Sequence, residues 1–81
     1  MKLRVLFFSV LRDITGHAEL NLECDGVTRI DELLVVLFAR WPKLAEWDQS
    51  LLVAVDQSYV KRDAALHDGA EVAIMPPVQG G

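Results

Sequence analysis

A single segment of this chain has the apolar spacing of an amphipathic helix, and its central position constrains the fold. Five apolar side chains between residues 28 and 42 recur along one helical face: Ile30, Leu33, Leu34, Leu37 and Phe38. Thr28 can cap this helix, with Asp31 three residues later in a capping-box-like arrangement. Pro42 ends it, because the residue before a proline is disfavoured in the helical region. We therefore expect one main helix in the middle of the chain.

The segments on either side of this helix have the composition of short β-strands. Apolar runs occupy residues 3–8, 51–55 and 71–75, and residues 18–24 alternate between apolar and polar side chains. A shorter strand is expected around residues 59–60, after a turn. Two strands, a helix and then two or three strands predict an α+β fold in two layers, with the helix packed across a mixed sheet. In such a sheet the final strand can lie beside the first.

Strand periodicity predicts apolar side chains on both faces of this sheet. The residues expected to face the helix are Val5, Phe7, Val72 and Ile74. Leu6, Phe8 and Met75 then point away from the helix, and Tyr59 is expected to join them. A sheet covered on one face is normally polar on the other, so this patch predicts a partner interface. Two alternatives stay open: loops could cover the patch, or a register slip of one residue would exchange the faces.

The last six residues, Pro76-Pro77-Val78-Gln79-Gly80-Gly81, have the composition of an extended tail. The two prolines end the preceding strand and favour a stiff path away from the domain. Six extended residues span roughly 20 Å. Gly80 and Gly81 have no side chains, so a narrow channel could admit them, although glycine is also common at unconstrained chain ends. We expect a folded domain over residues 1–75 and an extended tail over residues 76–81.

Composition excludes several classes of function. With 81 residues, 52% of them hydrophobic, the chain forms one domain with a buried core. Its net charge of −4 argues against nucleic acid and anionic membranes as partners, and favours a basic pocket on another protein. The chain has no apolar run long enough to span a membrane, so we expect a cytoplasmic protein.

Residue types that carry chemistry are sparse. Cys24 is the only cysteine, so no disulfide can form within the chain, and it is expected to be a small apolar residue. His17 and His67 lie in predicted turns, where surface roles are expected, and Asp56 begins a turn. Neither a metal-binding Cys/His cluster nor a glycine-rich phosphate loop is present. The terminal carboxylate of Gly81 is the remaining reactive group.

Three stretches resemble the small subunit of molybdopterin synthase, a ubiquitin-like family of sulfur carriers. Residues 4–8, with Leu11-Arg12 and Gly16 nearby, resemble the opening of that family. Residues 52–57 resemble its middle strand and turn, where asparagine is more usual than Asp56. Residues 66–81 are similar to its closing strand and tail almost throughout. The resemblance extends over the whole chain and is weakest over residues 27–50, where only the helical pattern matches.

This resemblance implies a β-grasp fold and a carrier that is not an enzyme on its own. A partner adenylyltransferase, similar to ubiquitin-activating enzymes, would use ATP to adenylate the Gly81 carboxylate. A sulfur donor protein would then convert it to a thiocarboxylate. Within a heterotetrameric synthase, the tail would enter the large subunit and donate sulfur to cyclic pyranopterin monophosphate, forming the dithiolene of molybdopterin. The carrier itself would hold no permanent cofactor or metal.

The resemblance also implies contacts with the large subunit. Phe8, Tyr59, Met75 and Leu6 would lie in this interface, and Arg12 resembles an arginine that the family places near the partner surface. Two other functions stay open. One is a sulfur carrier for thiamine synthesis or tRNA thiolation, although Pro76-Pro77-Val78 and the long helical middle favour molybdopterin. The other is a ubiquitin-like interaction module whose tail is never activated.

Overall fold

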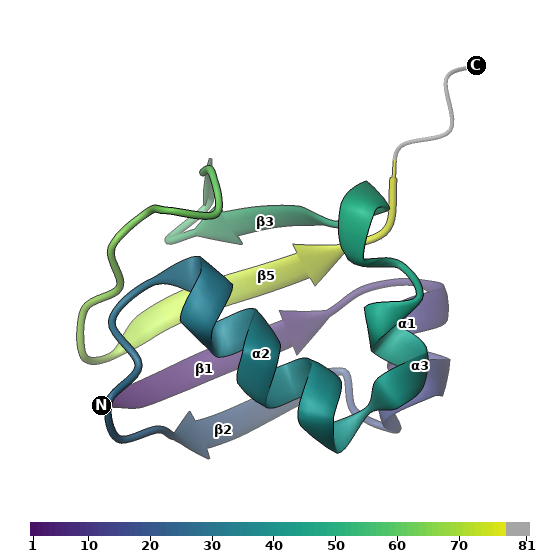
Figure 1. Cartoon of the computed structure of the whole chain (residues 1–81), viewed down its shortest axis with the longest axis horizontal. Helices are drawn as coiled ribbons and strands as arrows, with labels where there is room; N and C mark the ends of the chain where they lie inside the picture. The colour runs from purple at the N-terminus through teal and green to yellow at the C-terminus, as the bar shows by residue number, and fades with distance from the viewer. Residues whose placement is uncertain (78–81) are drawn as a thin grey trace.

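The computed structural model describes residues 1–77 and contains a five-stranded sheet with one long helix across it (Figure 1). The elements in chain order are β1 (Lys2–Phe7), α1 (Val10–Thr15), β2 (Glu19–Glu23), α2 (Ile30–Arg40), α3 (Pro42–Ala45), the 3-10 helix η1 (Asp48–Ser50), β3 (Leu52–Val55), β4 (Ser58–Tyr59) and β5 (Ala70–Met75). The tail residues Val78, Gln79, Gly80 and Gly81 lie outside the described residues.

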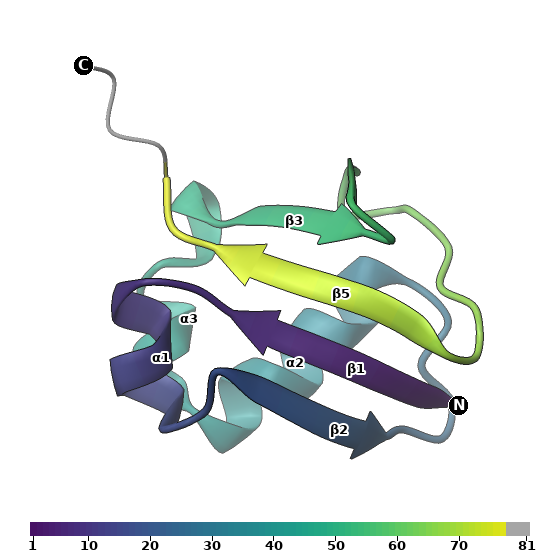
Figure 2. The same ribbon diagram turned by 180° about the vertical axis from the view of Figure 1, so that it is seen from behind.

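The strand order is β2-β1-β5-β3-β4, and the sheet is mixed. β1 and β5 pair in parallel at its centre, whereas β2 pairs antiparallel with β1, and β3 pairs antiparallel with both β5 and β4. Figure 1 shows α2 crossing one face, and in Figure 2 the strands of the other face lie in front with no described helix across them. The α+β class and the placement of the last strand beside the first are both confirmed.

The core lies between α2 and the inner face of the sheet, and its composition follows the two periodicities of the sequence. Helix α2 buries Ile30, Leu33, Leu34 and Leu37, and Phe38 packs against their cluster half-buried. The residues buried from the central strands are Leu3, Val5, Phe7, Ala70, Val72 and Ile74. Cys24 is also buried and reduced, as expected. No helix within residues 1–77 is long and apolar enough to cross a membrane.

The expected helix cap was wrong by one residue. α2 begins at Ile30, and Arg29 occupies the position before its first turn. The carboxylate of Glu32 reaches back to this end and accepts hydrogen bonds from the backbone N–H groups of Thr28, at 2.9 Å, and of Arg29, at 3.0 Å. It also accepts one from the Thr28 hydroxyl, at 2.8 Å. These hydrogen bonds lower the pKa of Glu32, and the two from Thr28 have the largest effect.

Core packing under α2 can be tested at Ile74, which is fully buried in the central strand β5. We expect Ile74→Val to lower the free energy of unfolding by about 0.5–1.5 kcal/mol, because it removes one buried methylene group. Val35→Ala is the matched control, since Val35 is 68% exposed on α2 and its truncation should change stability by no more than about 0.5 kcal/mol. Urea denaturation measures both, and equal effects would contradict this core.

Candidate functional site

The outer face of the sheet carries a shallow apolar groove. Its floor is formed by Ala54 and Ala73, which are cross-strand neighbours on β3 and β5. Leu6 lies beside Ala73, and Tyr59 lies beside Ala54 on the other side, so these four residues form one row across the sheet. Because alanine is small, the middle of this row is lower than its ends. We call this depression the outer-face groove.

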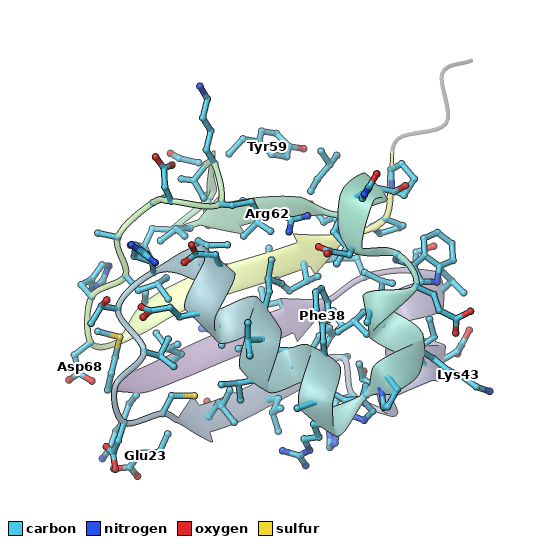
Figure 3. All side chains as sticks on the ribbon, in the orientation of Figure 1. Glu23, Phe38, Lys43, Tyr59, Arg62 and Asp68 are labelled. Atoms are coloured by element: carbon cyan, nitrogen blue, oxygen red, sulfur yellow. The ribbon has the colours of Figure 1, made fainter. Side chains whose placement is uncertain are left out.

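Large apolar side chains surround the floor of the outer-face groove. Phe8 and Met75 line it together with Leu6 and Tyr59, and Gln57 and Glu71 complete the lining. Phe8 is 45% exposed and Tyr59 is 70% exposed, which is unusual for large side chains on a folded domain. Figure 3 shows Tyr59 at the border of the sheet beyond β3. The sequence correctly predicted that these four side chains share the face opposite α2.

Charged residues lie beside the apolar part of this face. Arg4 on β1 forms ion pairs with Glu19 on β2 and, at 3.8 Å between Nη1 and Oε2, with Glu71 on β5. All three side chains are partly exposed, so these pairs contribute little to stability. They do neutralise opposite charges next to the groove, as in the polar border of a protein interface.

Arg12 does not line the outer-face groove. It lies on the short helix α1, is exposed, and belongs to an element at one end of the sheet in Figures 1 and 2. Gly16 ends this helix with a left-handed backbone, φ 76°, and its N–H donates to the Arg12 carbonyl. A role for Arg12 in partner binding therefore stays a prediction.

The base of the predicted tail adjoins the groove. Met75 is the last residue of β5, and Pro76 and Pro77 follow it without strand pairing. Pro76 is half-buried and Pro77 is exposed. A protein that binds in the groove would therefore also be close to the point where the last residues begin. The site residues Val78, Gln79, Gly80 and Gly81 lie outside the described part of the chain.

Sequence reasoning missed the contact between two titratable residues near the groove, His67 and Asp56. His67 Nε2 lies 2.6 Å from Asp56 Oδ2, and His67 Nδ1 lies 2.9 Å from the Asp68 carbonyl oxygen. The hydrogen bond to Asp56 is the main reason that the pKa of His67 is raised, and the same bond lowers the pKa of Asp56. The sequence placed His67 and Asp56 in two different predicted turns. They are eleven positions apart, and only the folded sheet brings them together.

Within residues 1–77, the His, Cys, Asp and Glu side chains form no group of three that could hold a metal ion.

Comparison with known proteins agrees with this architecture. The model of the ThiS family matches residues 5–81. The chain belongs to the ThiS family. One relative in this family, the molybdopterin synthase sulfur carrier subunit of Escherichia coli, is 38% identical over 81 residues, covering 98% of this chain and 99% of the relative.

Solved structures place this ThiS-family chain among β-grasp proteins. A Pyrococcus furiosus protein, provisionally described as subunit 1 of a molybdopterin converting factor, superposes with a TM-score of 0.85 at 29% identity, covering 96% of this chain and 99% of its own. Subunit 1 of the Helicobacter pylori molybdopterin-converting factor, solved in complex with subunit 2, gives a TM-score of 0.71 at 23% identity over the full length of both chains. The predicted β-grasp, ubiquitin-like fold is confirmed.

Proposed function

We propose that this chain is a sulfur carrier, the small subunit of a molybdopterin synthase. The observation that carries this proposal is the extent of the family match, which runs from residue 5 to residue 81 and so includes the terminal residues Gly80 and Gly81. The E. coli relative, which has this function in its name, corresponds to the chain over nearly its full length. The carrier is not an enzyme on its own and acts as the sulfur-donating subunit of a complex.

Chemistry at Gly81 requires activation by another protein. An α-carboxylate at a peptide C-terminus generally has a pKa of about 3.3–3.7, so this group is ionised at neutral pH and resists nucleophiles. One of its oxygens attacks the α-phosphorus of ATP, pyrophosphate leaves, and a mixed anhydride with AMP forms. Hydrosulfide supplied by a donor protein then attacks the carbonyl carbon, AMP leaves as the C–S bond forms, and loss of the S–H proton gives a thiocarboxylate. Because Gly81 has no Cβ, no side chain shields the carbonyl during either attack.

The outer-face groove is the surface that we assign to the large subunit. Exposed Phe8 and Tyr59 border a depression with an alanine floor, which suits one or two inserted apolar side chains. The groove ends at Met75, so a partner bound there would lie next to the start of the tail. A carrier that presents its C-terminus to a second protein needs this arrangement.

The intact mass of the chain tests the carrier function. After incubation with the activating enzyme, ATP and a sulfur donor, the chain should gain the mass difference between one sulfur and one oxygen atom. The gain should disappear when ATP is omitted, because the carboxylate is then never adenylated. A chain whose mass stays constant in the complete mixture would be an interaction module with an inert C-terminus, and the proposal would be wrong.

A further inference from the structure

We propose that His67, in its protonated form, is a positioning residue for the outer-face groove: it anchors the Asp56–Gln57 turn to the loop before β5 and so holds Tyr59 in place. This inference rests on the proposed function, because it takes the groove to be the surface that binds the large subunit.

The turn between β3 and β4 is strained. Asp56 has φ 50° and Gln57 has φ 73°, so two consecutive non-glycine residues occupy the left-handed region. A two-residue hairpin requires this backbone, but asparagine, aspartate and glycine are the residues that adopt it readily. Gln57 has no such preference. Such a backbone persists only where surrounding contacts hold it in place.

Hydrogen bonds from the neighbouring strand hold one side of this turn. The Asp56 N–H donates to the Glu71 carbonyl oxygen at 2.8 Å, and Asp56 Oδ1 accepts from the Glu71 N–H at 3.1 Å. These two bonds fix Asp56 against β5. The second carboxylate oxygen, Oδ2, faces His67 at 2.6 Å, and this contact ties the turn to the loop that leads into β5.

Both ring nitrogens of His67 face hydrogen-bond acceptors. Nε2 faces the Asp56 carboxylate and Nδ1 faces the Asp68 carbonyl oxygen. A neutral imidazole has a single N–H and can donate to only one of them, whereas an imidazolium donates to both. The geometry therefore selects the charged form of the ring. Loss of the proton breaks one of the two bonds.

The charges around His67 favour the same form. The carboxylate of Asp56 approaches from the turn, and that of Asp68 lies in the same loop as His67. From β5, Glu71 directs its backbone groups at Asp56 and its carboxylate at Arg4. From β1, Lys2 contributes its backbone N–H, which donates to Asp68 Oδ1 at 2.6 Å. The hydrogen bond to Asp56 is the main cause of the raised pKa of His67, and the negative charges of Asp56 and Asp68 add to it.

The anchored turn determines where Tyr59 lies. β4 contains only Ser58 and Tyr59, so Tyr59 is held against β3 by the turn on one side and by the hydrogen bond from the Val60 N–H to the Val53 carbonyl oxygen, at 3.0 Å, on the other. Gln57 and Tyr59 both line the outer-face groove. When His67 loses its proton, the strained turn loses a support, and Tyr59 becomes less well fixed as one wall of the groove. We therefore expect weaker partner binding above the pKa of His67.

NMR of the free chain tests the anchor without any partner. A titration from about pH 5 to about pH 9 should give a His67 midpoint above the ordinary value of about 6.5. The amide signals of Gln57 and Tyr59 should shift with the same midpoint. In His67→Gln these two signals should no longer follow that midpoint. If the Tyr59 signals of the unsubstituted chain do not follow His67, the anchor is disproved.

Binding of the purified large subunit tests the consequence for docking. Near pH 6 the unsubstituted chain should bind about two- to fivefold more tightly than His67→Gln, as expected for one exposed charged contact. The two affinities should converge near pH 9, once the His67 titration followed by NMR is complete. Asp56→Asn keeps the size of the side chain but removes its charge. In an Asp56→Asn background, the affinity difference between a chain with His67 and one with His67→Gln should depend much less on pH.

His17→Gln is the matched control, because His17 is also partly exposed but packs against Trp41 instead of the turn. Its affinity relative to the unsubstituted chain should not vary with pH. A ratio for His67→Gln that stays constant from pH 6 to pH 9 would overturn the positioning role. Absence of binding by every variant would instead contradict the proposed partner, and the NMR titration would still decide whether His67 anchors the turn.

Discussion

Deletion of Gly81 should abolish sulfur transfer while leaving the domain folded. The variant still ends in a glycine, Gly80, but its carboxylate lies one residue, or about 3.3–3.6 Å, short of its normal position. Displacement of a reacting group by about 1 Å can already reduce a rate about 100-fold, so we expect no detectable molybdopterin. The measurement is molybdopterin formation with purified large subunit, activating enzyme and sulfur donor.

Gly81→Ala tests whether the absence of a side chain at the last residue matters when the length of the tail is unchanged. It restores the position of the carboxylate but adds a Cβ beside the carbonyl, and we expect it to be inactive as well. Both variants should keep the urea denaturation profile of the unsubstituted chain, since neither change alters a residue of the core between α2 and the sheet. Molybdopterin formation by the deletion variant at the normal rate would rule out chemistry at the terminal carboxylate.

Phe8→Asp should prevent stable binding of the large subunit. Phe8 is 45% exposed at the border of the outer-face groove, and its backbone N–H still bonds to Ile74 beyond the end of β1. A buried aromatic anchor contributes about 2 kcal/mol or more to an interface, and an unpaired charge at the same place adds a desolvation cost. We expect the dissociation constant to rise at least about 30-fold, as measured by calorimetry.

Val35→Asp is the control for this substitution. Val35 is also exposed and apolar, at 68%, but it lies on α2, which covers the opposite face of the sheet. It should bind the large subunit with unchanged affinity. If Val35→Asp weakens binding as much as Phe8→Asp, the partner does not dock on the outer face.

The layers of the fold could be predicted because two periodicities in the sequence are clear. Alternation places Val5 and Phe7 on the helix side of β1, and the spacing of Leu33, Leu34 and Leu37 gives α2 one buried face. A register slip would have exchanged the two sides of the sheet. The burial of these residues excludes that alternative, and the exposure of Phe8 and Tyr59 excludes cover by loops.

Features that depend on strand register could not be predicted. Ala54 and Ala73 form the floor of the groove only because β3 and β5 pair with these residues opposite each other. Likewise, His67 reaches Asp56 only because the turn between β3 and β4 packs beside the start of β5, next to the loop that contains His67. The prediction of the helix cap was wrong for a local reason. Glu32 has a longer side chain than Asp31, and it reaches the backbone N–H groups of Thr28 and Arg29.

In the proposed function, the Gly81 carboxyl group carries sulfur to an acceptor in the large subunit. The most direct measurement is a single turnover with thiocarboxylated chain, large subunit and cyclic pyranopterin monophosphate, followed by intact mass. The carrier function predicts that the chain returns to the mass of its carboxylate form as dithiolene appears, one chain for each sulfur atom incorporated. Dithiolene formation without loss of sulfur from the chain, or loss of sulfur without dithiolene, would contradict it.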